Sequence, residues 1–486
     1  MTVAATAAQP APGPARRLPA AIIAAFSTPG IPLGGLLLVL AVYVPRFYVG
    51  LGLPFIAVAF TVLIVRLLDI SLDPILGVVM DRTRTPIGRY RPWLLLGAPI
   101  IIAGTFMLLP KASASVPALA LWMFVAYAGY SVLNLALSAW STNIAPTYDE
   151  RSRLWGWTQG VAVTGSVALL LLPLFTHGRV VLGKGASMPL VGWLLIAAFP
   201  TAVVICALFT PDRIGPTPQR YGLKDWWSAI SRPTMRRLMG ADLLLTLGPG
   251  TTAPLYVYFF HDAKGFNIRD VGFLLIFYIG AGLVGAPFWG RQAHRFGKHR
   301  TLQIACVCYA VTQTILMILP RVWPGYTLLQ ALPTAIGMTA VGFCASAFLL
   351  LVRAMVSDVA DEVRLEQGRN LTSLLFSMVT TTSKIGVAIT VTVVFPILQM
   401  AGYNGREGAV NTPHAIFVLE MCYLFAPIIL VFFGGSLFFG YKLDARRHGA
   451  IREALARRDD ELEPAAAEET LTGAIADGEV AAASQG

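Results

Sequence analysis

Charge is scarce in this 486-residue chain. Only 13% of its residues are Asp, Glu, Lys or Arg, whereas 56% are hydrophobic. Soluble domains carry about 25% charged residues, so the composition excludes an ordinary soluble enzyme and indicates a protein that lies in a membrane.

Residues that build metal sites and disulfides are also few. The chain has 6 His and 5 Cys, and every cysteine falls in an apolar segment without a paired spacing to histidines. We therefore expect neither disulfides nor a metal site. The phosphate-binding loop of ATPases, the nucleophile elbow of hydrolases and the dinucleotide fingerprint are absent too. We expect a protein that is not an enzyme and holds no cofactor.

Long apolar segments dominate what is present. With a helix-length window the sequence predicts an all-α integral membrane protein with twelve transmembrane helices. These are expected near 19–45, 55–80, 92–109, 116–145, 157–176, 188–209, 238–260, 271–289, 302–319, 326–356, 371–400 and 414–440.

The basic residues are unevenly distributed between the predicted loops. The 37 Lys and Arg exceed the 26 Asp and Glu, and most lie in segments on the same side as the two tails. By the positive-inside rule both termini face the cytoplasm, as expected for a bacterial-type inner membrane protein. This asymmetry explains the net charge of +11 without a nucleic-acid partner.

A short pattern recurs at matching places in the two halves. The pattern follows the second and the eighth predicted helices. It begins with Gly, three further residues, a polar residue and Arg, and it continues with a second Gly beside basic residues. Such a repeat is typical of alternating-access carriers. We expect a tail at 1–17, a six-helix bundle at 18–212, a central loop at 213–237, a second bundle at 238–446 and a tail at 447–486. The recurrence of this loop predicts gating residues at Asp81, Arg82, Gly88, Arg89 and Arg295.

Three charges interrupt the apolar run of the second helix. Arg66, Asp69 and Asp73 fall on one face at helical spacing. A charge at a membrane centre costs on the order of 2.5–3.5 kcal/mol, so an intramembrane cluster indicates function. Lys384 is a further intramembrane charge, about 18–20 Å from the end of its helix like Asp69, so the two can meet at one level.

These motifs resemble a known family, the glycoside-pentoside-hexuronide:cation symporters, or melibiose permease group, of the major facilitator superfamily. The resemblance rests on these segments: Asp73-Pro74 through Asp81-Arg82-Thr83 to Gly88 and Trp93, Trp140-Ser141, Thr147 to Arg153, Asp358 to Glu362 with Gly368-Arg369, and Ser383-Lys384 with Gly386. It implies a major facilitator fold of two six-helix halves and a protein that works as a monomer. It also implies that Asp69 and Asp73 bind the coupling cation, Na⁺ or H⁺, and that Lys384 and Arg66 take part in coupling.

The substrate site is less well defined. Trp140 matches an aromatic of the family's fourth helix, and polar neighbours could bind sugar hydroxyls: Asn134, Ser138, Asn143 and Gln159. The family's acidic sugar ligands have no counterpart here, since residues 26–45 hold no acid. Thr28-Pro29-Gly30 instead predicts a break in the first helix. A more apolar substrate stays open, because eukaryotic relatives of the family carry lysophospholipids.

Other charges lie near predicted helix ends. Asp242 and Arg353 are expected in solvated or interhelical pairs. Asp358 and Asp361 could pair with the basic loop after the second helix as a gate, or could simply be solvated.

The sequence thus predicts a cation-coupled secondary transporter of a sugar or glycoside, a small-molecule carrier embedded in a lipid bilayer. The alternatives are a carrier of a lysolipid or other amphiphile, and a non-transporting membrane sensor.

Overall fold

The computed structural model describes residues 18–145, 148–182, 184–212, 222–369, 371–441, 443, 447–455 and 457. The predicted N-terminal tail and the predicted C-terminal tail beyond 457 lie outside these residues. Residues 447–455, the start of that second tail, are helical.

Long helices make up nearly all of the described chain. Eleven helical stretches are long and apolar enough to cross a membrane. They are α1 to α3 as one stretch (Ala20–Gly50), α4 (Phe55–Arg82), α5 (Arg91–Leu108), α6 (Val116–Ile144), α9 (Met188–Phe209), α11 with a π-helix (Pro233–Ala263), α12 (Ile268–Phe296), α13 (Lys298–Ile318), α14 (Leu328–Gln367), α15 (Thr372–Met400) and α16 (Pro413–Ser436).

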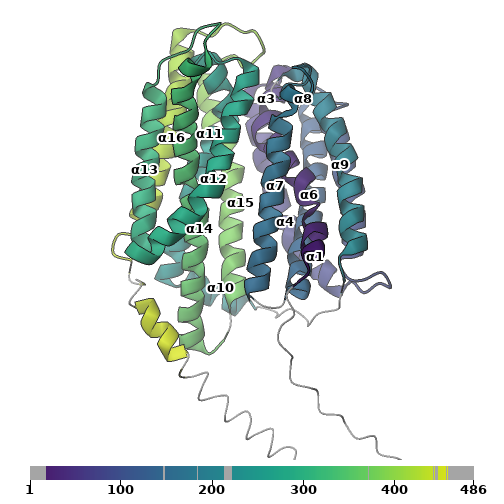
Figure 1. Ribbon diagram of the computed structural model, residues 1–486, viewed down its shortest axis with the longest axis vertical. Helices are drawn as coiled ribbons and strands as arrows, with labels where there is room; N and C mark the ends of the chain where they lie inside the picture. The colour runs from purple at the N-terminus through teal and green to yellow at the C-terminus, as the bar shows by residue number, and fades with distance from the viewer. Residues whose placement is uncertain are drawn as a thin grey trace, which may run out of the picture.

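The twelfth long helix of the described residues is α7 (Tyr148–Leu170), which packs against α2 (Gly30–Leu38) and α12. Its first turns carry Glu150 and Arg153, so its mean hydropathy is low although it lies in the bundle (Figure 1). The predicted all-α membrane fold with twelve long helices is confirmed.

The helices form two groups that lie beside each other (Figure 1). Helices up to α9 form the first group, called the N-half here, and helices from α11 onward form the C-half. Helices α4 and α15 pack against each other across the boundary. Short helices connect the long ones: α8 (Leu172–Phe175) and α10 (Leu223–Ile230).

The first helical stretch of each half contains a π-helix, and that of the N-half is also broken. Helix α1 (Ala20–Ser27) ends before Thr28 and Pro29, which confirms the predicted break. Nearer its other end the stretch contains a π-helix, Val39–Tyr43, and α11 ends in a second one, Phe259–Ala263. Single π-helical turns often mark functional positions.

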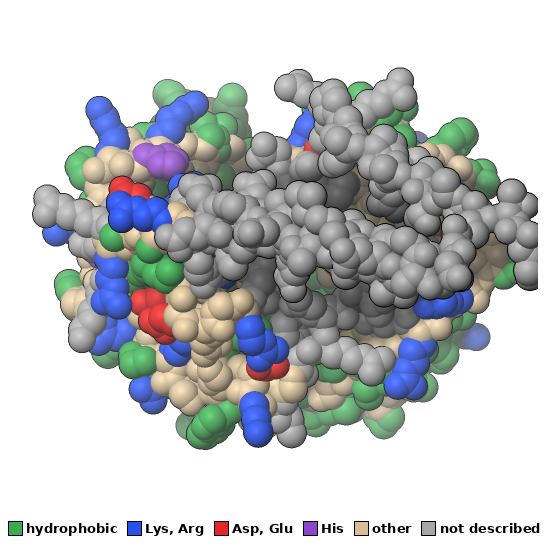
Figure 2. All heavy atoms as spheres, turned by 90° about the horizontal axis from the view of Figure 1, so that it is seen from below, with side chains coloured by type: hydrophobic (Ala, Val, Ile, Leu, Met, Phe, Trp, Pro, Cys, Tyr) green, Lys and Arg blue, Asp and Glu red, His purple; other side chains and the backbone are tan. Residues whose placement is uncertain are grey.

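The two ends of the bundle are distinct. We call the end with Ala20 and residues 447–455 the terminal side, and the other end, with loop 401–412, the far side (Figure 1). Lys and Arg side chains surround the rim of the terminal side (Figure 2).

Several predicted boundaries differ from the structure. Helix α7 begins nine residues before the predicted start at 157, and α12 ends seven residues after the predicted end at 289. Helix α11 begins at Pro233 rather than 238, because Pro233 occupies the first helical turn, where its missing N–H costs nothing. The predicted central loop 213–237 therefore contains α10 and the start of α11. Helix α14 continues to Gln367, well beyond the predicted end at 356, and stops at Gly368 with a positive φ of 68°.

Candidate ion-coupling site

Lys384 lies at the boundary between the halves. It projects from α15 to α4, where its ammonium contacts the carboxylate of Asp73. Its Nζ is also 3.7 Å from Oδ2 of Asp69. The predicted meeting of the three side chains is therefore present in the structure, and it joins residues 311 positions apart in the chain.

The two acids have different surroundings. Asp69 is buried, and its Oδ1 accepts a hydrogen bond of 2.6 Å from Ser131 Oγ on α6. The side chain of Asp73 is 21% exposed, and its Oδ1 has no hydrogen-bond partner among the described residues. Carboxylate and hydroxyl oxygens are ligands that hard cations prefer. The oxygens of Asp69, Asp73 and Ser131 could therefore hold a Na⁺ ion, and the two carboxylates could share a proton.

Ser131 was not among the predicted site residues. A single serine in an apolar helix is common, since its hydroxyl can bond the backbone. A usable signal was the spacing of Ser131, Asn134 and Ser138, which puts all three on one face of α6.

Arg66 lies on the expected helix face but does not join the acids. Its guanidinium carbon is 3.9 Å from the ring centroid of Tyr127 on α6. Among the described residues it makes no ion pair within 4 Å with Asp69 or Asp73. A cation over an aromatic face is stabilised without neutralising a carboxylate. Its predicted role in coupling stays a prediction.

Helix packing covers one of the predicted substrate residues, Trp140. Trp140 is fully buried, and its indole N–H donates to the carbonyl of Pro211 at 3.1 Å. The ring also packs edge-on against Phe26. Stacking of a sugar on Trp140 does not fit this conformation, because helix packing already covers the ring.

The other four predicted substrate residues are more accessible. They are half-buried on α6 or exposed on α7, and no hydrogen bond joins any two of them in the described part of the chain: Asn134, Ser138, Asn143 and Gln159. Their predicted role in substrate binding stays a prediction.

On the terminal side, the loop after α4 is fastened within the N-half. Gly88 has a φ of 119°, and a Cβ there would lie 2.1 Å from a carboxylate oxygen of Asp212. That carboxylate accepts the N–H of Tyr90 at 2.9 Å, so the loop requires glycine at this point. Arg89 is buried and donates to Met80 O at 3.4 Å, whereas Arg82 is exposed. The side chain of Asp81 lies outside the described part.

In the C-half, the matching loop follows α12. A residue other than the predicted one holds it in place. Arg295 is exposed, and Lys298 instead bonds Asp358 at 2.5 Å. His448 lies 3.3 Å from Asp358 and 3.0 Å from Asp361. In this conformation the described contacts of these acids are within the C-half, so the predicted gate pairing with the loop after α4 is not what the structure shows. Lys298 and His448 contact these carboxylates instead.

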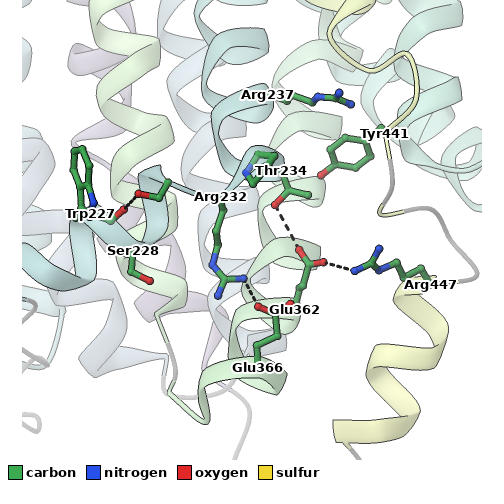
Figure 3. A pocket seen from close by; sticks show the side chains of 11 residues that line it. Trp227, Ser228, Arg232, Thr234, Arg237, Glu362, Glu366, Tyr441 and Arg447 are labelled. Atoms are coloured by element: carbon green, nitrogen blue, oxygen red, sulfur yellow. Dashed lines mark hydrogen bonds and ion pairs between the residues drawn. The ribbon is translucent and has the colours of Figure 1, made fainter.

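A cavity of about 730 Å³ opens beside these acids on the terminal side. Figure 3 shows Arg232 bonded to Glu366, and Glu362 bonded to Arg447 and Thr234. Ion pairs thus tie the end of α14 to Arg232, just before α11, and to residues 447–455, and a hydrogen bond from Thr234 ties it to α11 itself. On the solvent-exposed α10, a hydrogen bond from Arg369 lowers the pKa of Asp225 below its usual range.

Contacts between the halves continue from Lys384 toward the far side. The ring of Phe55 packs on Tyr258 and Phe395, at centroid distances of 5.8 and 4.8 Å. Glu407 accepts the N–H of Gly185 at 2.7 Å, and Gln399 that of Ile56 at 2.9 Å. These described contacts hold the halves together on the far side.

Comparison with known proteins identifies related carriers. The chain is 25% identical to the isoprimeverose transporter of Lactiplantibacillus pentosus, over 79% of this chain and 80% of the relative. It is 26% identical to the putative glycoside/cation symporter YagG of Escherichia coli, over 82% of this chain and 86% of the relative. The human sodium-dependent lysophosphatidylcholine symporter 1 is 24% identical, over 83% of this chain and 80% of the relative.

The fold is also found in a solved structure. The crystal structure of the nucleoside transporter NupG matches with a TM-score of 0.64 at 12% identity, covering 86% of this chain and 98% of that one. At that identity the match concerns the fold alone. The family model of MFS/sugar transport proteins matches residues 25–445, nearly the whole membrane region. The chain therefore belongs to the family of MFS/sugar transport proteins.

Proposed function

We propose that this protein is a cation-coupled symporter that carries a sugar or glycoside by alternating access. The observation that carries the proposal is Lys384 of the C-half in contact with Asp73 and near Asp69 of the N-half. A cation that binds the carboxylates competes with the ammonium for them. Cation occupancy therefore alters the electrostatic energy of the contact between the halves, and that energy couples the ion to the movement.

The names of the relatives support a sugar as the substrate. A lysolipid is the second candidate, since residues 26–45 carry no acid to bind sugar hydroxyls and one relative is named as a lysophosphatidylcholine symporter. The coupling ion is Na⁺ or H⁺ in this proposal. The basic rim of the terminal side supports a cytoplasmic location of both termini in a bacterial-type inner membrane. The protein acts as a monomer of two six-helix halves.

Uptake into proteoliposomes tests the proposal. Wild type and Asp73→Asn are compared under imposed Na⁺ or H⁺ gradients with a panel of glycosides and lysolipids. We expect gradient-driven accumulation of a glycoside by wild type and its loss in Asp73→Asn. A membrane potential of 100 mV adds about 2.3 kcal/mol per charge moved, so the potential should raise accumulation. Lysolipid uptake alone, or glycoside uptake indifferent to Asp73, would contradict the proposal.

A further inference from the structure

A second buried carboxylate lies beside the coupling lysine, on the other side of α15. Asp242 of α11 is 2% exposed. Its Oδ2 accepts hydrogen bonds from Thr382 Oγ1 at 2.8 Å and from Ser383 Oγ at 2.7 Å. The next residue in the chain is Lys384. The sequence placed Asp242 near a helix end, but α11 begins at Pro233, so the acid lies more than two turns inside the helix.

Close packing accompanies these hydrogen bonds. A Cβ on Gly386 of α15 would be 3.2 Å from the carbonyl oxygen of Leu243, and a Cβ on Gly250 of α11 would be 2.4 Å from Cγ2 of Thr390. Small residues at both positions let the two helices approach closely. Helix α15 thus packs closely on α11 from Thr382 to Thr390, a stretch of about two turns that includes Lys384.

The described polar partners of Asp242 all lie within the C-half. No ion pair within 4 Å reaches its carboxylate from any described residue. The charged neighbour is Arg353 of α14, which donates to Thr380 Oγ1 at 2.8 Å, one turn before Ser383. A carboxylate held by hydroxyl groups keeps its place whatever Lys384 contacts, because its partners are short side chains with little freedom to move.

We propose that Asp242 is the positioning residue for Lys384. By holding Thr382 and Ser383 it fixes α15 to the C-half, so that the ammonium reaches the N-half from a constant place. The movement that separates Lys384 from Asp73 is then a movement of the N-half against α15, and α15 does not slide on α11. This inference rests on the proposed symport.

Variants separate positioning from a merely structural role. Asp242→Asn removes the charge, and Thr382→Val with Ser383→Ala removes both hydroxyl donors while keeping the acid. Thr381→Val is the matched control, since the described contact of its hydroxyl is the carbonyl of Ser377 on the same helix, not Asp242 or Arg353. We expect the cation concentration for half-maximal uptake to rise by about tenfold or more in the first two variants. The substrate concentration for half-maximal uptake, measured at saturating cation, should stay the same.

An unchanged cation requirement together with a lowered Tm would show that Asp242 only stabilises the fold, and would overturn the inference. Wild type is measured first. If it shows no gradient-driven uptake, the proposed symport itself fails. If wild type is coupled but the variants keep its cation requirement, only the positioning role fails.

An engineered disulfide between α11 and α15 provides an independent test. A Cβ on Gly250 would lie 3.7 Å from Cβ of Thr390, which is within disulfide geometry. Gly250→Cys with Thr390→Cys, in a background without the native cysteines, is oxidised and then reduced. We expect uptake to be equal in both states and equal to that of the background. Loss of uptake on oxidation, recovered with reductant, would show that α15 slides on α11 and would overturn the inference.

Discussion

Helix α15 makes two kinds of polar contact on its two sides. Toward α4, across the halves, Lys384 forms a contact of opposite charges with Asp73, whose other oxygen has no partner among the described residues. Toward α11, within the C-half, short hydroxyl side chains bond the buried Asp242. The first contact uses a long, flexible side chain and a partly exposed acid, so it can be exchanged for an ion. The second uses short side chains and close backbones, so it resists movement.

The largest effect should come from breaking the contact across the halves. Lys384→Gln leaves Asp69 and Asp73 without the cation that faces them across the halves, so binding of an ion no longer changes that contact. We expect gradient-driven uptake in proteoliposomes to fall by about 100-fold or more, because the energy that couples the ion to the movement is lost. Lys224→Gln, on exposed α10, is the control. Near-normal coupled uptake by Lys384→Gln would show that the lysine is not part of coupling.

The next effect concerns the hydroxyl that holds Asp69. Ser131→Ala removes a hydrogen bond to a carboxylate, worth about 1.5–3 kcal/mol. We expect the half-saturating cation concentration to rise by roughly tenfold, with maximal uptake retained. Ser71→Ala is the matched control, because Ser71 is on the same helix as Asp69 and, within the described part of the chain, its hydroxyl bonds the carbonyl of Leu67 and no acid. An unchanged cation requirement would exclude Ser131 from the ion site.

A smaller effect should come from crowding the contact with α11. Gly386→Ala places a methyl group 3.2 Å from Leu243 O and 3.3 Å from Thr246 Cβ. We expect overpacking to cost about 1–3 kcal/mol and to lower the Tm of the purified protein. The cation requirement should rise with it, because Ser383 and Thr382 are pushed away from Asp242. A lower Tm with unchanged cation dependence would weaken the distinction between the two sides.

The smallest effect should come from Thr392, which faces α4. Its hydroxyl donates to Ala59 O over 3.5 Å, which is a weak hydrogen bond. Thr392→Val should change the free energy of unfolding by less than about 0.5 kcal/mol and leave uptake as in wild type. A clear loss of uptake would mean that the contact of α15 with α4 depends on more than the Lys384 ion pair.

Some of the site could be predicted from the sequence. Charges in an apolar run are costly, so Asp69, Asp73 and Lys384 were recognisable, and equal depth put them at one level. Ser131 and Asp242 were missed for different reasons. A serine gives no pattern of its own, and Asp242 was placed near a helix end because the start of α11 was set five residues late. Trp140 was expected to stack on a substrate, but its ring is buried against Phe26.

The sequence by itself determined the helices and the membrane, since hydrophobic runs of this length have no other stable surroundings and their backbone groups must bond within the segment. It also determined that the intramembrane charges need partners. Only the tertiary structure decided which partners they have. Among the described residues Arg66 forms no ion pair with Asp69 or Asp73 and lies over the ring of Tyr127, whereas Lys384 contacts Asp73 from 311 residues away. That choice depends on which helix faces meet, and a pattern within one helix does not contain the position of the next.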